Sequence, residues 1–179
     1  VRSDRVPPYT LERTARRTPP LLVAESSMGG EAIILFTRVP VAGAVKTRLM
    51  GALSGGQCAA LHSAFLCDVY EKCLAARKGV RLYYTGGSPA LLPDAVRGAA
   101  LFEQADGGLG EKMRIAFEET LREHRAAVLI GSDLPALTAD ILTNAFRLLE
   151  KNDAVIGPAG DGGYYLIGMK EYLPQLFSV

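Results

Sequence analysis

Two aspartates stand where buried-type strands would end, and this pair of carboxylates is the first sign of chemistry in the sequence. Asp133 follows the apolar run Ala127–Gly131 within Gly-Ser-Asp-Leu-Pro. Asp161 has a glycine on each side and precedes the strand-like run Tyr164–Ile167. Glycines let the backbone approach a ligand closely and present a carboxylate at a strand end. Hard cations such as Mg²⁺ or Mn²⁺ take a few carboxylates together with phosphate oxygens. We therefore expect Asp133 and Asp161 to share one Mg²⁺ or Mn²⁺ ion.

Each aspartate also has a purely structural interpretation. Asp-Gly is the strongest short signal for a β-hairpin, so Asp161 is as compatible with an ordinary turn as with a site. Asp133 could cap the next helix, but Thr138 already stands at that position. Pro135 restricts Leu134 to an extended conformation, which fixes Asp133 where the strand ends.

A basic loop follows the first apolar run and reads Arg-Val-Pro-Val-Ala-Gly-Ala-Val-Lys-Thr-Arg-Leu over residues 38–49. Backbone N–H groups near Gly43 and the guanidinium of Arg48 would hold phosphate oxygens, with Lys46 as a point charge. The loop is not a P-loop, because that motif needs a glycine where Val45 stands. A solvated basic loop is the alternative.

Residues 104–114 contain a glycine-rich turn, Asp106 to Gly110, that opens onto an expected helix. A turn at a helix N-terminus can bind an anion or the edge of a base. A flexible connection between strand and helix explains the same residues equally well. We expect structural roles for His62 and His124, because no Ser or Cys nucleophile pattern lies near them.

The elements that must position these residues alternate between strand and helix. Apolar runs that read as buried strands predict a largely parallel sheet with helices on both faces, a three-layer α/β/α sandwich. In such sheets ligands bind outside the carboxyl ends of the strands, where all four segments above lie. The expected strands are 32–37, 80–85, 100–103, 127–131, 153–157 and 164–167. The expected helices are 54–77, with core positions Leu61, Phe65, Val69 and Cys73, then 91–96, 111–124, 138–150 and one from Glu171 to Val179.

Composition bounds the class of protein. The chain has 179 residues, 49% hydrophobic and 22% charged, which fits one globular domain. No apolar run reaches the ~18–20 residues of a membrane-spanning helix. The net charge of +1 argues against nucleic acid as the main partner. Three cysteines without a disulfide framework suggest reduced thiols and a cytoplasmic protein. Residues 1–27 have no periodicity and are expected to be a disordered or non-native extension, with residues 28–179 as a single nucleotide-binding domain.

Three motifs together carry a family resemblance: Phe-Thr-Arg-x-Pro-x-x-Gly-x-x-Lys-Thr-Arg-Leu over 36–49, Gly-Ser-Asp-Leu-Pro over 131–135, and Gly-Pro-Ala-x-Asp-Gly-Gly-Tyr-Tyr-Leu-Ile-Gly over 157–168. In their order and spacing the chain resembles a bacterial and archaeal family of small GT-A-fold transferases, one branch of which is named as an arsenosugar-biosynthesis glycosyltransferase. That family is similar to the molybdenum-cofactor and 2-phospholactate guanylyltransferases, which share the nucleotide-diphospho-sugar transferase fold.

The resemblance implies a nucleotide or nucleotide sugar at the strand ends, a small-molecule acceptor, and a divalent metal held by Asp133 and Asp161. It implies phosphate contacts from the first loop and a base or sugar near 104–113. The catalytic residues that we expect are Asp133, Lys46 and Arg48. The nucleotide- or phosphate-binding residues that we expect are Arg38, Gly43, Lys46, Thr47, Arg48, Gly107 and Gly110.

Two departures from the family pattern concern the substrate. Gly108 and Lys112 stand where the family usually has Asp and Arg. The family usually continues beyond Phe177 with a segment that contains Trp, so we expect part of the acceptor side to be missing from this chain. Three hypotheses follow: a metal-dependent glycosyltransferase with a nucleotide-sugar donor, a nucleotidyltransferase that uses an NTP and a phosphorylated substrate, and a nucleotide-binding protein with impaired catalysis.

Overall fold

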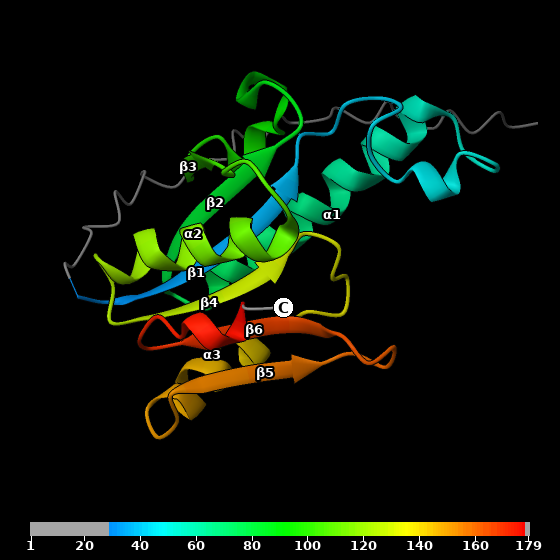
Figure 1. The fold of residues 1–179 in the computed structure, drawn as a ribbon. Helices are drawn as coiled ribbons and strands as arrows, with labels where there is room; N and C mark the ends of the chain where they lie inside the picture. Colours follow the sequence, from blue (N-terminus) through cyan, green and yellow to red (C-terminus); the bar gives the residue numbers. More distant parts are fainter. Residues whose placement is uncertain (1–28, 178–179) are drawn as a thin grey trace, which may run out of the picture.

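The computed structural model describes residues 29–177, and its centre is a six-stranded sheet in the order β3-β2-β1-β4-β6-β5 (Figure 1). The sequence predicts every one of these strands to within two residues at each end. The mostly parallel α/β architecture is therefore confirmed. The strands are β1 Glu31–Arg38, β2 Gly79–Thr85, β3 Ala100–Glu103, β4 Ala126–Gly131, β5 Ala154–Pro158 and β6 Tyr164–Met169. The helices are α1 Gly55–Ala75, α2 Leu109–Leu121 and α3 Ala139–Leu149.

The topology places a switch point beside β1. Strands β3, β2, β1 and β4 pair in parallel, and β6 is antiparallel to both of its neighbours, β4 and β5. The chain leaves β1 for β2 and β3 on one side, and α2 then returns it to β4 on the other side. The connections after β1 and β3 therefore leave in opposite directions across the sheet. A crevice for ligands forms at the carboxyl ends of such strands.

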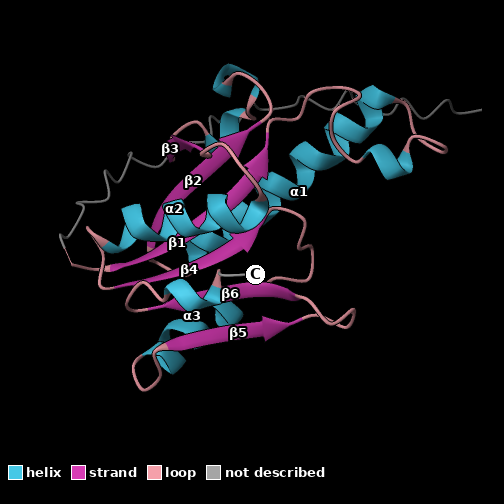
Figure 2. Cartoon of the chain, viewed as in Figure 1, coloured by secondary structure: helices cyan, strands magenta, loops and turns pink. Residues whose placement is uncertain are grey.

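Helices cover both faces of the sheet, as an almost continuous burial of β1 requires. Six consecutive β1 residues, 32–37, are buried. Alternate strand side chains point to opposite faces, so both faces need a cover. Helices α1 and α3 pack on one face, and α2 lies on the other with Leu173, Leu176 and Phe177 (Figure 2). The result is the expected three-layer sandwich.

Side-chain caps fix the starts of two helices where the sequence predicts them. The Ser54 hydroxyl accepts from the backbone N–H of Gln57, whose side chain accepts from the N–H of Ser54 in return. Thr138 accepts from the N–H of Ile141 in the same way. Such caps satisfy N–H groups that have no partner within the helix. The segments that lead into α1 and α3 are therefore held at defined positions.

Three helix predictions need correction. The predicted helix 91–96 is instead two 3-10 turns, Pro89–Leu91 and Asp94–Val96, because Pro93 interrupts it. The predicted helix from Glu171 is wrong within the described residues, where Pro174 follows an extended Leu173 and only a 3-10 turn, Pro174–Leu176, forms. Helix α2 begins and ends two to three residues earlier than predicted.

The buried face of α1 also differs from the prediction. Val69 and Cys73 are buried as expected, whereas Leu61 and Phe65 are only half-buried. The face that packs on the sheet is turned by about one residue and includes Cys58, His62 and Leu66. A histidine fits there because its ring makes hydrogen bonds to the end of β1. The expectation of an extension falls on residues 1–27, outside the described part of the chain. Among the described helices, none is long and apolar enough to cross a membrane.

Candidate active site

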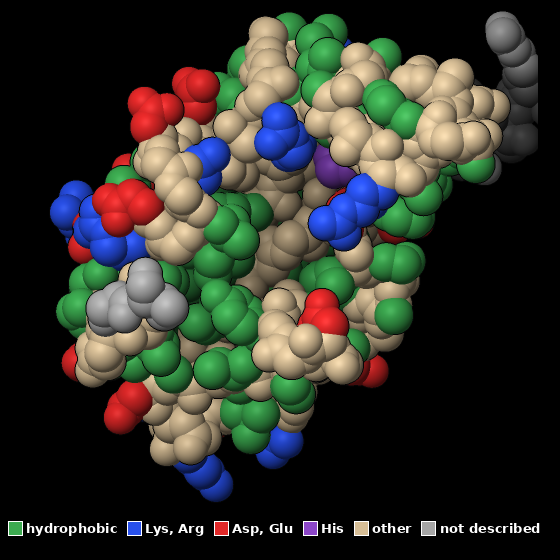
Figure 3. Space-filling model, turned by 45° about the vertical axis from the view of Figure 1, so that its right-hand side comes forward, with side chains coloured by type: hydrophobic (Ala, Val, Ile, Leu, Met, Phe, Trp, Pro, Cys, Tyr) green, Lys and Arg blue, Asp and Glu red, His purple; other side chains and the backbone are tan. Residues whose placement is uncertain are grey.

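A cleft of about 660 Å³ opens at the carboxyl ends of β1, β2 and β4. Its walls come from the loop after β1, His62 in the N-terminal half of α1, the residues after β4 and the connection between β3 and α2. Figure 3 shows a hollow of this kind, flanked by Lys and Arg side chains and with a histidine at its border. Five of the predicted site residues line the cleft: Arg38, Lys46, Thr47, Gly107 and Asp133. Others that line it are Thr37, His62, Thr85, Gln104, Ser132 and Lys112.

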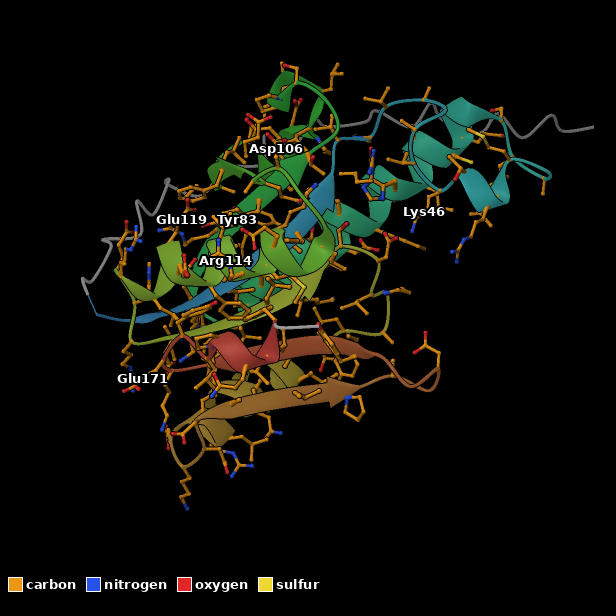
Figure 4. The ribbon with its side chains drawn as sticks, viewed as in Figure 1. Lys46, Tyr83, Asp106, Arg114, Glu119 and Glu171 are labelled. Atoms are coloured by element: carbon orange, nitrogen blue, oxygen red, sulfur yellow. The ribbon has the colours of Figure 1, made fainter. Side chains whose placement is uncertain are left out.

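Lys46 joins the loop after β1 to the loop after β4. Its Nζ lies 2.7 Å from Oδ1 of Asp133, and its side chain is only 14% exposed. The ammonium also lies 4.6 Å from the centre of the Phe65 ring, a cation–π contact. The Lys46 backbone is left-handed, with φ 51° and ψ 33°, which is unfavourable for a residue with a Cβ. Figure 4 shows Lys46 on this loop and Asp106 on the connection that leads to α2.

Asp133 is held as a carboxylate. The contact with His62 and the ion pair with Lys46 lower the pKa of Asp133 from 3.8 to about 2, although partial burial acts in the opposite direction. The side chain remains 59% exposed toward the cleft. An ionised oxygen group with free solvent access can meet a cation or a donor on a ligand. The sequence-based expectation of a charged group at the end of β4 is consistent with this geometry.

His62 connects the ends of two central strands. Its Nε2 lies 2.9 Å from the carbonyl oxygen of Arg38, which can only accept, so this nitrogen carries the hydrogen. Its Nδ1 lies 3.4 Å from Oδ1 of Asp133. The Thr37 hydroxyl contacts both the His62 ring and the Ser132 hydroxyl, at 3.2 and 3.0 Å. This polar network places Asp133 relative to β1.

The position of His62 at the cleft was not predicted from the sequence, although a structural role was expected. A usable signal existed. His62 lies four residues after Cys58 and four before Leu66, so a helix places all three on one face. A polar ring on a face that packs against a sheet needs partners there. Thr37 and Ser132, each next to a predicted site residue, could have supplied them.

Asp161 lies in the turn of the β5–β6 hairpin. The N–H of Gly163 donates to its Oδ1 over 3.1 Å, and Gly162 has φ +88°. The hairpin interpretation is therefore confirmed. β6 pairs with β4 so that Leu166 faces Ile130, which places this turn beyond the end of β4, at the edge where Asp133 lies. No contact joins Asp161 to Asp133 among the described residues, and their sharing of a metal stays a prediction.

The remaining predicted residues lie beside the cleft lining rather than in it. Arg48 is exposed on the 3-10 turn Thr47–Leu49. Gly110 is the second residue of α2. Gly43 has φ +83°, and its backbone nitrogen would lie 2.9 Å from a Cβ added at Gly55. Gly43 therefore shapes the loop through close packing on the start of α1, and the phosphate roles of all three stay predictions.

The chemistry of the donors decides whether a divalent metal fits here. Within residues 29–177, no group of three or more His, Cys, Asp or Glu side chains could hold a metal ion by itself. Mg²⁺ is commonly bound by only one or two carboxylates, with substrate phosphates and waters as the other ligands. The ionised Asp133, together with Asp161 at the same sheet edge, matches that requirement. A metal that arrives with a diphosphate therefore fits these residues.

Comparison with known proteins assigns the chain to a family. Residues 70–179 match the family "Uncharacterized protein conserved in bacteria (DUF2064)". The chain belongs to this family. No curated protein is significantly similar to it.

Solved structures agree on the fold of this family member. A candidate nucleotide-diphospho-sugar transferase from Desulfovibrio desulfuricans G20 is 30% identical, with a TM-score of 0.76, over 84% of this chain and 68% of that one. Rv0371c from Mycobacterium tuberculosis H37Rv, solved as a complex with manganese, is 12% identical with a TM-score of 0.52, over 86% of this chain and 77% of Rv0371c. CMP:2-keto-3-deoxy-manno-octonic acid synthetase complexed with CTP is also 12% identical, with a TM-score of 0.51, over 84% of this chain and 78% of the synthetase. The fold is that of the nucleotide-diphospho-sugar transferases.

Proposed function

We propose that this DUF2064 protein is a transferase that uses a nucleotide, and more specifically a metal-dependent glycosyltransferase. Its donor would be a nucleotide-diphospho-sugar and its acceptor a small molecule. One observation carries the proposal: the ionised Asp133 and the cations Lys46 and Arg38 line one cleft at the switch point of this fold. The 30% identity to a candidate nucleotide-diphospho-sugar transferase supports the choice of donor.

The cations would bind and orient the diphosphate. Lys46 offers N–H donors from the lining of the cleft, and its partner Asp133 keeps the ammonium there before a ligand arrives. Arg38 can offer paired N–H donors to two phosphate oxygens. Preorganised positive charge stabilises the negative charge that develops on a departing diphosphate. Lys46 would therefore act on both the binding and the leaving-group step.

Asp133 and Asp161 would hold the divalent metal. A bound Mg²⁺ or Mn²⁺ would neutralise diphosphate oxygens and make the diphosphate a better leaving group. The low pKa of Asp133, about 2, keeps this carboxylate ready for a cation throughout the neutral range. The network from His62 through Thr37 to Ser132 would keep the Asp133 side chain in place.

The bond that is broken separates this proposal from its closest rival. A nucleotidyltransferase would hold the same diphosphate elements but accept attack on the α-phosphate of an NTP, with pyrophosphate as the leaving group. A synthetase of this fold has been solved with CTP, which makes this the second candidate. Loss of catalysis is a third hypothesis, motivated by Gly108, which stands where the family that the chain resembles usually has an Asp.

Calorimetric titration of a panel of NDP-sugars and NTPs, each with Mn²⁺ and with Mg²⁺, tests the proposal. The glycosyl proposal predicts that one NDP-sugar binds more tightly than every NTP and is slowly hydrolysed to the NDP. Preference for an NTP over all NDP-sugars would contradict it in favour of nucleotidyl transfer. Tight binding with no turnover of any ligand would support the impaired protein. Failure of every nucleotide to bind would overturn all three.

A further inference from the structure

Arg38 lines the cleft without a side-chain partner that would fix its charged group. Within residues 29–177, its guanidinium forms no ion pair and donates no hydrogen bond. Lys46 differs, because Asp133 holds its ammonium at 2.7 Å. A long side chain that moves freely loses rotamer freedom when it binds a ligand, and this loss weakens binding. An Arg38 that is ready for a phosphate therefore needs another kind of support.

Hydrogen bonds from three elements hold the backbone around Arg38. The carbonyl oxygen of Arg38 lies 2.9 Å from Nε2 of His62 on α1. The N–H of the residue after Arg38 donates to the carbonyl oxygen of Thr85, at the end of β2, over 2.8 Å. The amide of Gln104, just after β3, donates to the carbonyl oxygen of Thr37 over 3.1 Å. The base of the Arg38 side chain therefore has a defined place, and only its far end still needs a support.

Gly86 lies directly against that far end. Arg38 is paired with Thr85 in the parallel register, so Gly86 follows at the level of the Arg38 side chain. A Cβ added at Gly86 would lie 3.1 Å from Nη2, 3.4 Å from Cζ and 3.5 Å from Nε of Arg38. Because three of its atoms are at similar distances, the guanidinium lies across this position, in space that a side chain would fill. Gly86 also has φ +80°, which is unfavourable for a residue with a Cβ.

The next residue continues the contact between the loops after β1 and β2. A Cβ added at Gly87 would lie 3.1 Å from side-chain atoms of Val39 and Val41. Two consecutive glycines therefore let the loop after β1 rest directly on the backbone that follows β2.

We propose that Gly86 is a positioning residue, whose bare backbone seats the Arg38 guanidinium in the cleft before a phosphate arrives. A guanidinium that is already in place binds phosphate oxygens with a smaller loss of freedom. Because this seat matters only if Arg38 binds the diphosphate, it rests on the proposed function.

Calorimetry with inorganic pyrophosphate and Mn²⁺ tests the seat. Gly86→Ala should displace the guanidinium, which is the end of a flexible side chain, and should weaken pyrophosphate binding at least about fivefold. Gly29→Ala is the matched control, because Gly29 also has a positive φ, +102°, but a Cβ there has no atom within 4 Å and lies at the other end of β1. A thermal unfolding scan should show a similar loss of stability for both variants, and only Gly86→Ala should lose affinity.

Gly86→Asn separates the contact from the backbone strain. Asn tolerates a positive φ better than Ala and still carries a Cβ. It should therefore unfold at a temperature closer to that of the wild type and lose affinity as Gly86→Ala does.

A double-mutant cycle with Arg38→Met shows whether Gly86 acts through Arg38. Arg38→Met removes the charge and keeps an unbranched side chain, so it should weaken pyrophosphate binding at least about tenfold. In that background Gly86→Ala should change the affinity less than about twofold, because no guanidinium is left to displace. A general disturbance of the cleft would instead reduce the affinity equally in both backgrounds.

The outcomes distinguish failure of the seat from failure of the proposed function. If Arg38→Met weakens pyrophosphate binding but both Gly86 variants bind as the wild type does, the seat is wrong while the proposed function stands. Equal losses from Gly86→Ala with and without Arg38 would also overturn the seat. If the wild type binds neither nucleotides nor pyrophosphate, the proposed function fails and the seat fails with it.

Discussion

Replacement of Asp133 by Asn should change the binding of a diphosphate in opposite directions with and without metal. The substitution keeps the shape of the side chain and removes its charge. Without metal, Asp133 repels an incoming anion and also holds Lys46 in an ion pair at 2.7 Å. A neutral amide in its place would do neither, so a metal-free diphosphate should bind more tightly. With metal, the variant lacks a charged ligand, so the metal-dependent part of the affinity should fall.

The magnitudes follow from charges and distances. Two like charges about 5 Å apart, at an effective dielectric constant of about 60, repel by about 1 kcal/mol, so metal-free pyrophosphate should bind about fivefold more tightly to the variant. A carboxylate about 2.2 Å from a divalent cation gains about 3–4 kcal/mol even in water, so the Mn²⁺-dependent affinity should fall by about a hundredfold or more.

The substitution also has a cost for folding. The pKa of Asp133 falls from 3.8 to about 2, which corresponds to about 2 kcal/mol at full value. Because the side chain is 59% exposed, solvent screening reduces this to about 1 kcal/mol. The variant should therefore unfold at a slightly lower temperature while remaining folded at room temperature.

Calorimetry of inorganic pyrophosphate, once in EDTA and once with saturating Mn²⁺, measures both effects on the same sample. Asp153→Asn is a suitable control, because Asp153 is an exposed carboxylate whose cationic partner, Lys170, is 3.6 Å away and outside the cleft. It should change neither affinity. A loss of affinity for Asp133→Asn in both conditions, or no change in either, would refute the assignment of Asp133 as a metal ligand beside Lys46.

Three further predictions concern the same network. The stability that Asp133 provides is present above its ordinary pKa of 3.8 and is lost as the pH falls toward about 2. Urea titrations should therefore show a difference in unfolding free energy between wild type and Asp133→Asn of about 1 kcal/mol near neutral pH, and no difference near pH 2. A difference that does not change with pH would contradict this. His62→Ala should destabilise the fold by about 1–3 kcal/mol, because it removes a buried donor to the end of β1. It should also raise the pKa of Asp133, so the acid transition seen in the wild type should move to higher pH; an unmoved transition would exclude the contact between the two side chains. Gly55→Ala would place a Cβ 2.9 Å from the backbone nitrogen of Gly43, so it should shift the basic loop and weaken pyrophosphate binding. Gly56→Ala is the control, because a Cβ at that position has no atom within 4 Å, and it should leave pyrophosphate binding unchanged. Equal effects of the two substitutions in calorimetry would exclude the packing of Gly43 on Gly55 as the cause.

The sheet could be predicted from the sequence because its strands are unusually clear. Residues 32–37 and 126–130 are buried almost without interruption, and a parallel sheet with helices on both faces produces that pattern. The end of the chain was harder. Residues after Glu171 are apolar enough to suggest a helix, but Pro174 and the packing of Phe177 against α2 favour a single 3-10 turn instead. Such a competition between local propensity and tertiary contact is not visible in the sequence.

The site could be predicted as a set of segments but not as a set of contacts. Strand ends and glycines located Lys46, Asp133 and Gly107 near one edge of the sheet. The left-handed backbone of Lys46 and the bond from His62 to Arg38 depend on how α1 packs on β1, and one residue of helix rotation decides this. Gln104 carried no signal of its own, because an amide links two strands only when two backbone carbonyls meet its NH₂ group.

A crystal grown with Mn²⁺ and a nucleoside diphosphate would test the central claim most directly, with the ion located by its anomalous scattering. We expect one manganese peak in the cleft, within coordination distance of carboxylate oxygens of both Asp133 and Asp161 and of the diphosphate. We also expect Lys46 in contact with a phosphate oxygen. A manganese ion bound by phosphates alone, or a nucleotide bound outside the cleft, would contradict the proposed site.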